Sequence, residues 1–166
     1  GITLGNLGAL DFNAGRAEEA EKWQRAALAI HREVGNRRGE GITLGNLGMV
    51  AADRGQLEVA AILHHQALAI VREVRQPSGE FRILVSLGEL YQVAGRDDEA
   101  RAAFEGALTL AREIGYRRGG TIALQGIANL LARQGETLAA RSASEQALAE
   151  ARDQGDRKMQ GHVLLG

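Results

Sequence analysis

The sequence predicts an all-α protein in which antiparallel helix pairs stack as a solenoid, and three observations support this fold class. The string GITLGNLG occurs twice, at residues 1–8 and 41–48. Aligning residue 1 with residues 41, 81 and 121 places four repeats in register without a gap. Within each repeat, apolar residues recur at spacings of three and four, as on one face of a helix. A fixed period of this length is typical of arrays whose repeats bury their apolar faces only against their neighbours.

The 40-residue register is carried by small and apolar residues that return to the same column. These columns are Leu7, Leu47, Leu87 and Ile127; Gly8, Gly48, Gly88 and Ala128; Gly15, Gly55, Gly95 and Gly135; and Ala20, Ala60, Ala100 and Ala140. We therefore expect a single solenoid domain over 1–166, with repeats 1–40, 41–80, 81–120 and 121–160 and a partial fifth at 161–166. Both ends fall within expected helices, so the pattern suggests a fragment of a longer array.

The opening string is expected to form the first helix of a pair. Leu4, Leu7 and Gly8 should face the neighbouring helix, where a glycine lets two backbones approach closely. A phosphate-binding loop is excluded, because the string lacks the G-K-[ST] ending and follows no strand.

The second helix of each pair follows a turn glycine, Gly15 in the first repeat. Its apolar stripe consists of Ala20, Trp23, Ala27, Ile30 and Val34. Acids crowd its first turn and an arginine lies near its end, both of which the helix dipole favours. The column that begins with Gln24 varies through His64, Phe104 and Ser144, which should affect packing quality.

The next pair should begin around residue 37. Gly35 and Gly115 are expected to cap the preceding helices in the left-handed conformation, and Asn36 is a good N-cap. Pro77 falls where the first helical residue belongs. Arg75 replaces the capping glycine, so we expect that turn to differ locally without breaking the stack.

Composition excludes several classes of protein. The net charge of −1 lacks the basic excess of a nucleic-acid module, and the absence of cysteine excludes disulfides and thiolate metal sites. No apolar run approaches the ~20 residues that span a bilayer, and no signal-peptide pattern precedes the first repeat. We expect a cytoplasmic protein that binds neither nucleic acid nor membrane. All basic residues except Lys22 and Lys158 are arginine, which suggests a bacterial genome rich in GC.

No arrangement of residues predicts catalysis, a cofactor or a metal ion. His64 and His65 are adjacent, so they point to different faces of a helix, whereas one-helix zinc sites space their ligands three or four apart. We expect a packing histidine beside a surface histidine, and a protein that is not an enzyme.

The pattern Leu7-Gly8, Gly15, Ala20 and Ala27 resembles the tetratricopeptide repeat. The 40-residue period resembles a subclass found in kinesin light chains, G-protein-signalling modulators and bacterial regulators fused to NTPase domains. Asp11 and Ala51 depart from the family's aromatic preference, which Tyr91 meets. The resemblance implies a right-handed superhelix whose concave groove is lined by the first helix of each pair.

The resemblance also implies which residues line that groove. Carried over by column, the candidates are Asn6, Asn46, Met49, Asp53, Arg82, Ser86, Glu89, Gln92, Arg118, Gln125, Asn129 and Arg133. Asparagine amides can both donate to and accept from a peptide backbone, and arginines can bind carboxylates through two hydrogen bonds. A solvated mixed surface is the alternative interpretation of the arginines.

Three functions are consistent with this framework. The first is a protein-interaction scaffold that binds an extended, acidic peptide or a partner helix in the groove. The second is a regulatory sensor array of a bacterial signalling protein, with a small ligand as one candidate effector. The third is end-to-end self-association through the terminal faces of the solenoid.

Overall fold

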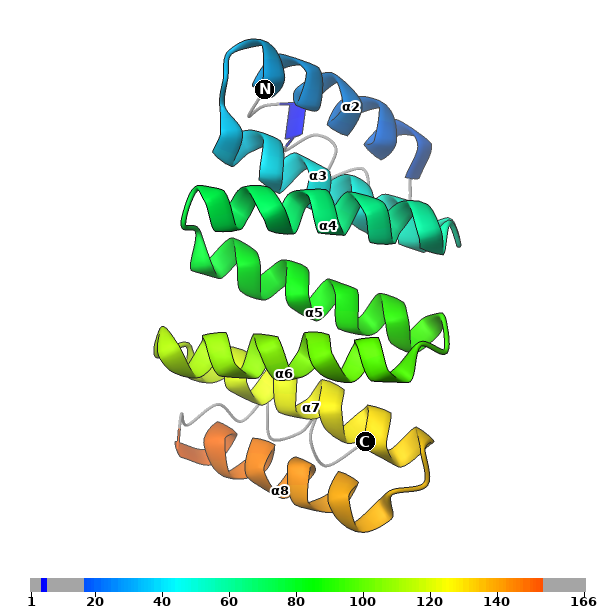
Figure 1. Ribbon diagram of the computed structural model, residues 1–166, viewed down its shortest axis with the longest axis vertical. Coiled ribbons are helices and arrows are strands. Elements are labelled where there is room, and N and C mark those ends of the chain that lie inside the picture. The colour runs from blue at the N-terminus through cyan, green and yellow to red at the C-terminus, as the bar shows by residue number, and fades with distance from the viewer. Residues whose placement is uncertain (1–3, 6–16, 154–166) are drawn as a thin grey trace. The chain divides into compact units, whose positions relative to one another are not determined.

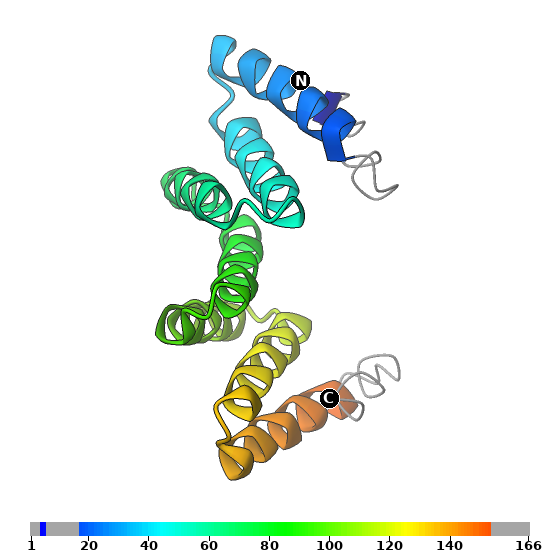
Figure 2. The ribbon, with the colours of Figure 1, turned by 90° about the vertical axis from the view of Figure 1, so that its right-hand side faces the viewer.

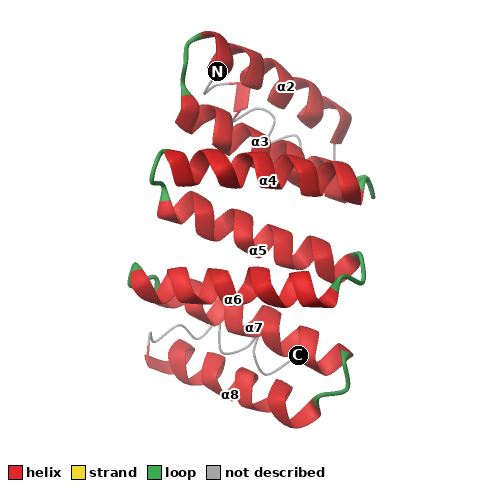
Figure 3. Ribbon diagram, viewed as in Figure 1, coloured by secondary structure: helices red, strands yellow, loops and turns green. Residues whose placement is uncertain are grey.

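The computed structural model describes residues 4–5 and 17–153, and seven helices make up almost all of this part of the chain (Figures 1 and 3). The helices are α2 (Ala17–Glu33), α3 (Arg37–Asp53), α4 (Leu57–Glu73), α5 (Pro77–Val93), α6 (Asp97–Glu113), α7 (Arg117–Arg133) and α8 (Thr137–Asp153). Each is 17 residues long, and no strand occurs among the described residues. The all-α fold class is confirmed, and α3, α5 and α7 begin where the next pairs were expected.

Short turns with a left-handed residue end the helices. Gly35 and Gly115 have φ of +67° and +68°, as predicted for the caps between repeats. The turn glycines inside the repeats, represented by Gly55 at +72°, adopt the same conformation. Glycine suits these positions because it lacks the Cβ that makes a positive φ costly.

The turn at Arg75 differs locally from the other turns between repeats without breaking the stack, as predicted, because Pro77 cannot donate the bond that Arg37 makes to the carbonyl of Gly35. Arg75 itself adopts a positive φ of 50°. The backbone N–H of Gln76 donates to the carbonyl of Val71 at 2.8 Å, just as Asn36 donates to His31 at 2.8 Å. Arg75 therefore has a strained, left-handed backbone conformation, which glycine adopts without strain at the other turns. Helix α5 still begins at Pro77.

The helix starts follow the capping expectations in part. The side chain of Asn36 accepts a hydrogen bond from the Gly39 N–H at 2.9 Å, which confirms it as the N-cap of α3. The caps of α4, α6 and α7 are Gln56, Arg96 and Tyr116, and none of them makes a side-chain capping bond. Acids in the first turns of α2, α4 and α6 compensate the helix dipole instead.

The contacts divide the chain into two compact units, Gly1–Ser86 and Leu87–Gly166. In the N-terminal unit α3 packs against both α2 and α4, and in the C-terminal unit α7 packs against both α6 and α8 (Figure 2). Alanines at the contact points are fully buried: Ala20, Ala27, Ala60, Ala67, Ala100, Ala107 and Ala147. Their small side chains let neighbouring helices lie close together, and leucines fill the remaining space.

The predicted inward glycines make room for large side chains of the second helix. A Cβ on Gly48 would lie 2.6 Å from the ring of His64, and one on Gly88 would lie 2.6 Å from the ring of Phe104. The close approach is therefore confirmed, but it is between a backbone and a ring rather than between two backbones. His64 is 1% exposed and His65 is exposed, as expected.

Candidate binding surface

The predicted groove residues of the N-terminal unit lie on two helices. Asn46, Met49 and Asp53 follow one another at helical spacing on α3, and Arg82 and Ser86 do so on α5. Met49, Asp53 and Arg82 are exposed, whereas Asn46 and Ser86 are half-buried. Their predecessor in the first repeat, Asn6, lies outside the described residues.

Asn46 contacts a buried side chain of α2. Its Nδ2 lies 3.5 Å from Oε1 of Gln24, at the long limit of a hydrogen bond, and Gln24 donates to the carbonyl of Gly5 at 2.9 Å. Gln24 is 1% exposed. The amide of Asn46 therefore faces the interior as well as the surface, so it has a structural contact that the sequence interpretation missed.

The same pair of columns is filled differently in the C-terminal unit. Phe104 takes the place of Gln24, and 22 residues further on Gly126 takes the place of Asn46. A Cβ on Gly126 would lie 2.5 Å from the phenylalanine ring. Gln24 is thus accompanied by the amide of Asn46, and the ring of Phe104 is accompanied by a glycine. This compensation was the signal in the sequence that could have revealed Gln24.

The predicted residues of the C-terminal unit are joined by hydrogen bonds. Gln125 donates to Oδ1 of Asn129 at 2.9 Å, both on α7. Arg133, at the end of α7, donates to the backbone carbonyl of Gln92 on α5 at 2.6 Å. The Oε1 atom of Gln125 is buried and accepts no hydrogen bond from the described residues. Two separate hydrogen bonds thus involve four of the predicted residues, one within α7 and one from α7 to α5.

Two predicted residues, both exposed, have pKa values shifted by the atoms that surround them. Desolvation raises the pKa of Glu89 and lowers the pKa of Arg82, which in each case favours the neutral form. Neither residue forms an ion pair within the described part of the chain. An unpaired, desolvated charge is a feature that a ligand of opposite charge can relieve.

A separate hollow of about 300 Å³ lies in the N-terminal unit, on another face of α3. Leucines and small residues of α3, including Leu44 and Leu47, form its floor. Walls come from α2 and α4, with Leu28 and Val59 among the lining residues and Arg25 and Arg32 also present. The sequence interpretation did not anticipate this hollow.

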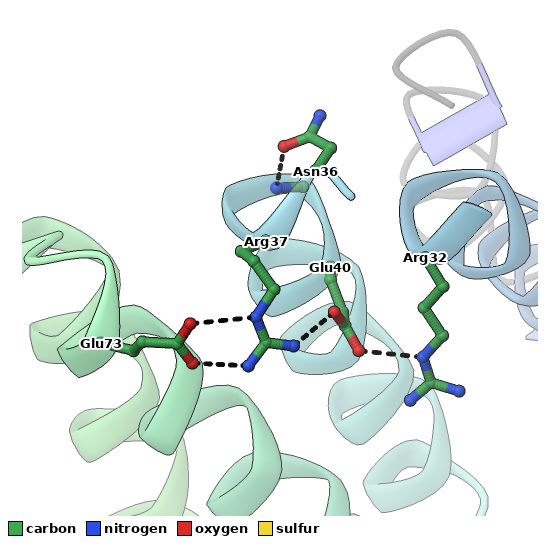
Figure 4. Close-up of polar contacts among 6 residues, drawn as sticks. Arg32, Asn36, Arg37, Glu40 and Glu73 are labelled. Carbon is green, nitrogen blue, oxygen red and sulfur yellow. Dashed lines mark hydrogen bonds and ion pairs between the residues drawn. The ribbon is translucent and has the colours of Figure 1, made fainter. Parts of the chain in front are cut away.

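Ion pairs connect the helices where one repeat joins the next (Figure 4). The carboxylate of Glu40, on α3, is bound by Arg32 at 2.9 Å and by Arg37 at 2.6 Å. Arg37 also binds Glu73, on α4, at 2.5 Å. Burial alone would raise the pKa of Glu40, but the hydrogen bonds from the two arginines outweigh it and lower the pKa below its ordinary value. This network links α2, α3 and α4.

The described residues provide no group of three potential metal ligands among His, Cys, Asp and Glu. None of the helices in this part of the chain is long and apolar enough to cross a membrane.

The part of the chain that the structure describes forms seven helices of equal length, which are separated by turns with a left-handed residue and repeat in pairs every 40 residues. This arrangement defines the class of α-helical repeat proteins. Within this class the chain belongs to the tetratricopeptide repeat family, whose family model matches residues 1–73 and 79–153. The resemblance inferred from the glycine and alanine columns is therefore confirmed. Proteins of this fold typically serve as protein-interaction scaffolds. No match to a curated protein was found.

Solved structures share this fold at low sequence identity. Aspartyl phosphate phosphatase F from Bacillus subtilis superimposes with a TM-score of 0.91 at 16% identity, covering 96% of this chain and 42% of that protein. A Rap protein complexed with competence and sporulation factor gives 0.88 at 15% identity, with coverages of 96% and 45%. A signal transduction ATPase with numerous domains and a tetratricopeptide repeat sensor, from Pyrococcus horikoshii, gives 0.86 at 16%, with coverages of 96% and 25%. The chain thus spans less than half the length of each of these proteins.

Proposed function

We propose that this chain is a non-catalytic protein-interaction module that binds an extended peptide on the exposed faces of its first helices. The observation that carries the proposal is the polar surface of α5 and α7 in the C-terminal unit. There Gln125 donates to Asn129 and retains an unpaired, buried acceptor, while Arg133 is held against the carbonyl of Gln92. The amide of Asn129 is exposed, and such an amide can both donate to and accept from an extended peptide backbone.

The charges of this surface favour acidic side chains in the peptide. Arg118 and Arg133 are exposed on α7. Glu89 is the principal opposing charge on the same faces, and its raised pKa reduces the cost of keeping it near an acidic ligand. We expect the peptide to be acidic overall, with a backbone N–H directed at Asn129. The cytoplasm remains the compartment in which we expect this interaction.

A matched pair of variants tests the proposal. Gln125→Ala with Asn129→Ala removes the polar pair on α7, and Ser142→Ala with Gln146→Ala removes a pair of the same spacing on α8. Peptides would be selected from a random library against the native chain, and their affinities measured by fluorescence polarisation. We expect the α7 variant to weaken binding by about tenfold, corresponding to one or two hydrogen bonds, and the α8 variant to leave it unchanged. Equal affinities for all three proteins would contradict the proposal.

A regulatory sensor array is the second candidate, and the partial coverage of larger proteins favours it. One structural relative carries its tetratricopeptide repeats as a sensor within a signalling ATPase, and another is complexed with a competence and sporulation factor. Under this hypothesis peptide binding on α5 and α7 would change the state of a neighbouring domain. Measuring the activity of the parent protein with and without a selected peptide distinguishes it from a simple scaffold. End-to-end self-association stays a separate prediction, for which sedimentation over a wide concentration range is the test.

A further inference from the structure

The junctions between repeats share an arrangement of charges that changes at the third junction. Each junction places an arginine in the last turn of one helix, and these are Arg32, Arg72 and Arg112. Eight residues further on, the first turn of the next helix provides Glu40 and Glu80 at the first two junctions but Gly120 at the third. Arg72 binds Glu80 at 2.6 Å, which repeats the pairing of Arg32 with Glu40. The third junction therefore retains the arginine and lacks the acid.

The first junction shows what the arrangement does when it is complete. Two guanidinium groups, from Arg32 and Arg37, hold the carboxylate of Glu40, which is 7% exposed (Figure 4). The third junction has the equivalents of both arginines, Arg112 and Arg117, at the same positions of the repeat. Proline replaces the second arginine at the second junction. Of the three junctions that the structure describes, the first and third thus carry the pair of arginines.

A pocket lies at the position of the missing carboxylate, and the carboxylate of Glu150 partly fills the space over Gly120. Its volume is about 310 Å³, and its lining residues are Ala111, Arg112, Gly115, Tyr116, Arg117, Gly120 and Glu150. All of them belong to α6, α7, α8 or the turn between α6 and α7, within the C-terminal unit. The first turn of α7 contains no acid, so no side chain there compensates the positive end of the helix dipole.

Glu150 compensates the arginines only in part. It stands in a column that holds Ile30 and Ile70 in earlier repeats. Its Oε1 lies 3.6 Å from Nη2 of Arg112, beyond hydrogen-bond distance, and its side chain is about one third exposed. Arg117 has no ion-pair partner among the residues that the structure describes. Two arginines therefore face one loosely held carboxylate.

We propose that this pocket binds an acidic side chain of a partner protein, whose carboxylate takes the position that Glu40 fills at the first junction. Arg112 and Arg117 hold it as Arg32 and Arg37 hold Glu40, and it takes the space over Gly120 that the carboxylate of Glu150 partly fills. Glu150 turns aside, since its carboxylate lies 2.5 Å from where a Cβ on Gly120 would be and its side chain is flexible. The site is separate from the polar surface of α5 and α7, and it would bind even if that surface did not.

The test uses two peptides that differ by one charge. The probe is acetyl-Gly-Gly-Glu-Gly-Gly-amide, and the control is the same peptide with glutamine in place of glutamate. The side-chain Nε–Hε resonances of Arg112 and Arg117 are followed by NMR at constant ionic strength. We expect saturable shifts with the glutamate peptide and at least about tenfold weaker binding of the glutamine peptide, as charge-assisted hydrogen bonds require. Equal responses to both peptides would overturn the proposal.

Variants of the chain provide the second arm. Gly120→Glu combined with Glu150→Ile restores the column residues of the earlier repeats and should abolish the shifts of Arg112, because an internal carboxylate then fills the pocket. Arg112→Gln should weaken the probe about tenfold, whereas Arg72→Gln, at a junction that already has its acid, should not affect it. Circular dichroism shows whether each variant is folded. If the double variant does not fold, the affinity of Arg112→Gln for the probe tests the proposal. Undiminished binding to folded Arg112→Gln contradicts the proposal.

A third arm separates a partner's side chain from a free metabolite. Succinate offers the same carboxylate chemistry without a peptide backbone. Binding of succinate with no binding of the glutamate peptide would overturn the assignment to a protein partner. Tighter binding of the peptide than of succinate would support it.

Discussion

The two units build the same helix pairs around cores of different chemistry. Among the described residues, the buried polar or charged side chains of the N-terminal unit are Gln24, His31, Glu40, Thr43 and His64, whereas the C-terminal unit buries only Thr121. The column of Gln24 and His64 is occupied in the C-terminal unit by Phe104, which is 1% exposed. The same buried position of the repeat can thus hold either a polar side chain that forms hydrogen bonds or a wholly apolar one. The two fillings should respond differently to substitution and to pH.

The largest effect is expected from Phe104→Ala. The ring lies between Gly88 and Gly126, neither of which has a side chain that could fill the cavity left behind. Removing a buried phenylalanine costs about 3–5 kcal/mol, and the upper half of that range fits a site that cannot collapse. Urea denaturation measures the loss, with Glu105→Ala, an exposed neighbour on α6, as the control. A loss below about 1 kcal/mol would mean that the ring is not the main filling of this core.

The second effect is the pH dependence that His64 gives to the N-terminal unit. Burial lowers the pKa of His64 to about 4, with smaller contributions from the positive charges of His65 and Arg82. Because the unfolded chain takes up this proton near pH 6.5, stability is complete above that pH and falls as the pH drops towards 4. The shift corresponds to at most about 3 kcal/mol.

His64→Gln isolates this contribution from that of the carboxylates. Glutamine is the residue of the same column in the first repeat, and it does not titrate. The free energy of unfolding of the native chain should fall more steeply between pH 6.5 and 5 than that of the variant. Parallel curves would show that His64 is protonated in the folded state without penalty.

The third effect compares two junctions of the N-terminal unit. Glu40 binds two arginines and is buried, whereas Glu80 binds one, and its side chain is about one fifth exposed. Glu40→Gln should cost about 2 kcal/mol, because both arginines lose a charged partner at a buried site. Glu80→Gln should cost less than about 1 kcal/mol, as for an ion pair near the surface. Equal losses in urea denaturation would show that burial does not distinguish the two sites.

The fold could be predicted from the sequence because its signals are local and repeated. The glycine turns, the alanine columns and the N-cap at Asn36 each report a constraint of the backbone, and four copies make the period visible. The bonds of the candidate surface could not be predicted in the same way. Asn46 contacts Gln24, a residue of the preceding helix, and this contact is not visible in the sequence around Asn46. Likewise, the hydrogen bond from Arg133 to the Gln92 carbonyl depends on how α7 packs against α5.

The pocket lined by Arg112 and Arg117 could not be predicted from the sequence for a further reason. Its signal in the sequence is the absence of a glutamate, since Gly120 occupies the column of Glu40 and Glu80. In addition, Glu150 occupies the column of Ile30 and Ile70. Each change alone resembles ordinary variation between repeats. Their relation emerges only when the structure brings α7 and α8 together, because the two positions are 30 residues apart in the chain.

The smallest effect concerns the turn at Arg75, where the N-terminal unit departs from the glycine rule that Gly115 obeys in the C-terminal unit. An L-residue in the left-handed conformation costs about 1 kcal/mol relative to glycine, so Arg75→Gly should stabilise the chain by about that amount. The reciprocal variant Gly35→Arg should destabilise it similarly, since a Cβ at Gly35 would meet no atom within 4 Å and the cost is that of the backbone alone. Urea denaturation at neutral pH measures both changes. A neutral or destabilising Arg75→Gly would show that the arginine side chain makes a contribution that offsets its backbone strain, and the second repeat would then differ from the others for a functional reason rather than by tolerance.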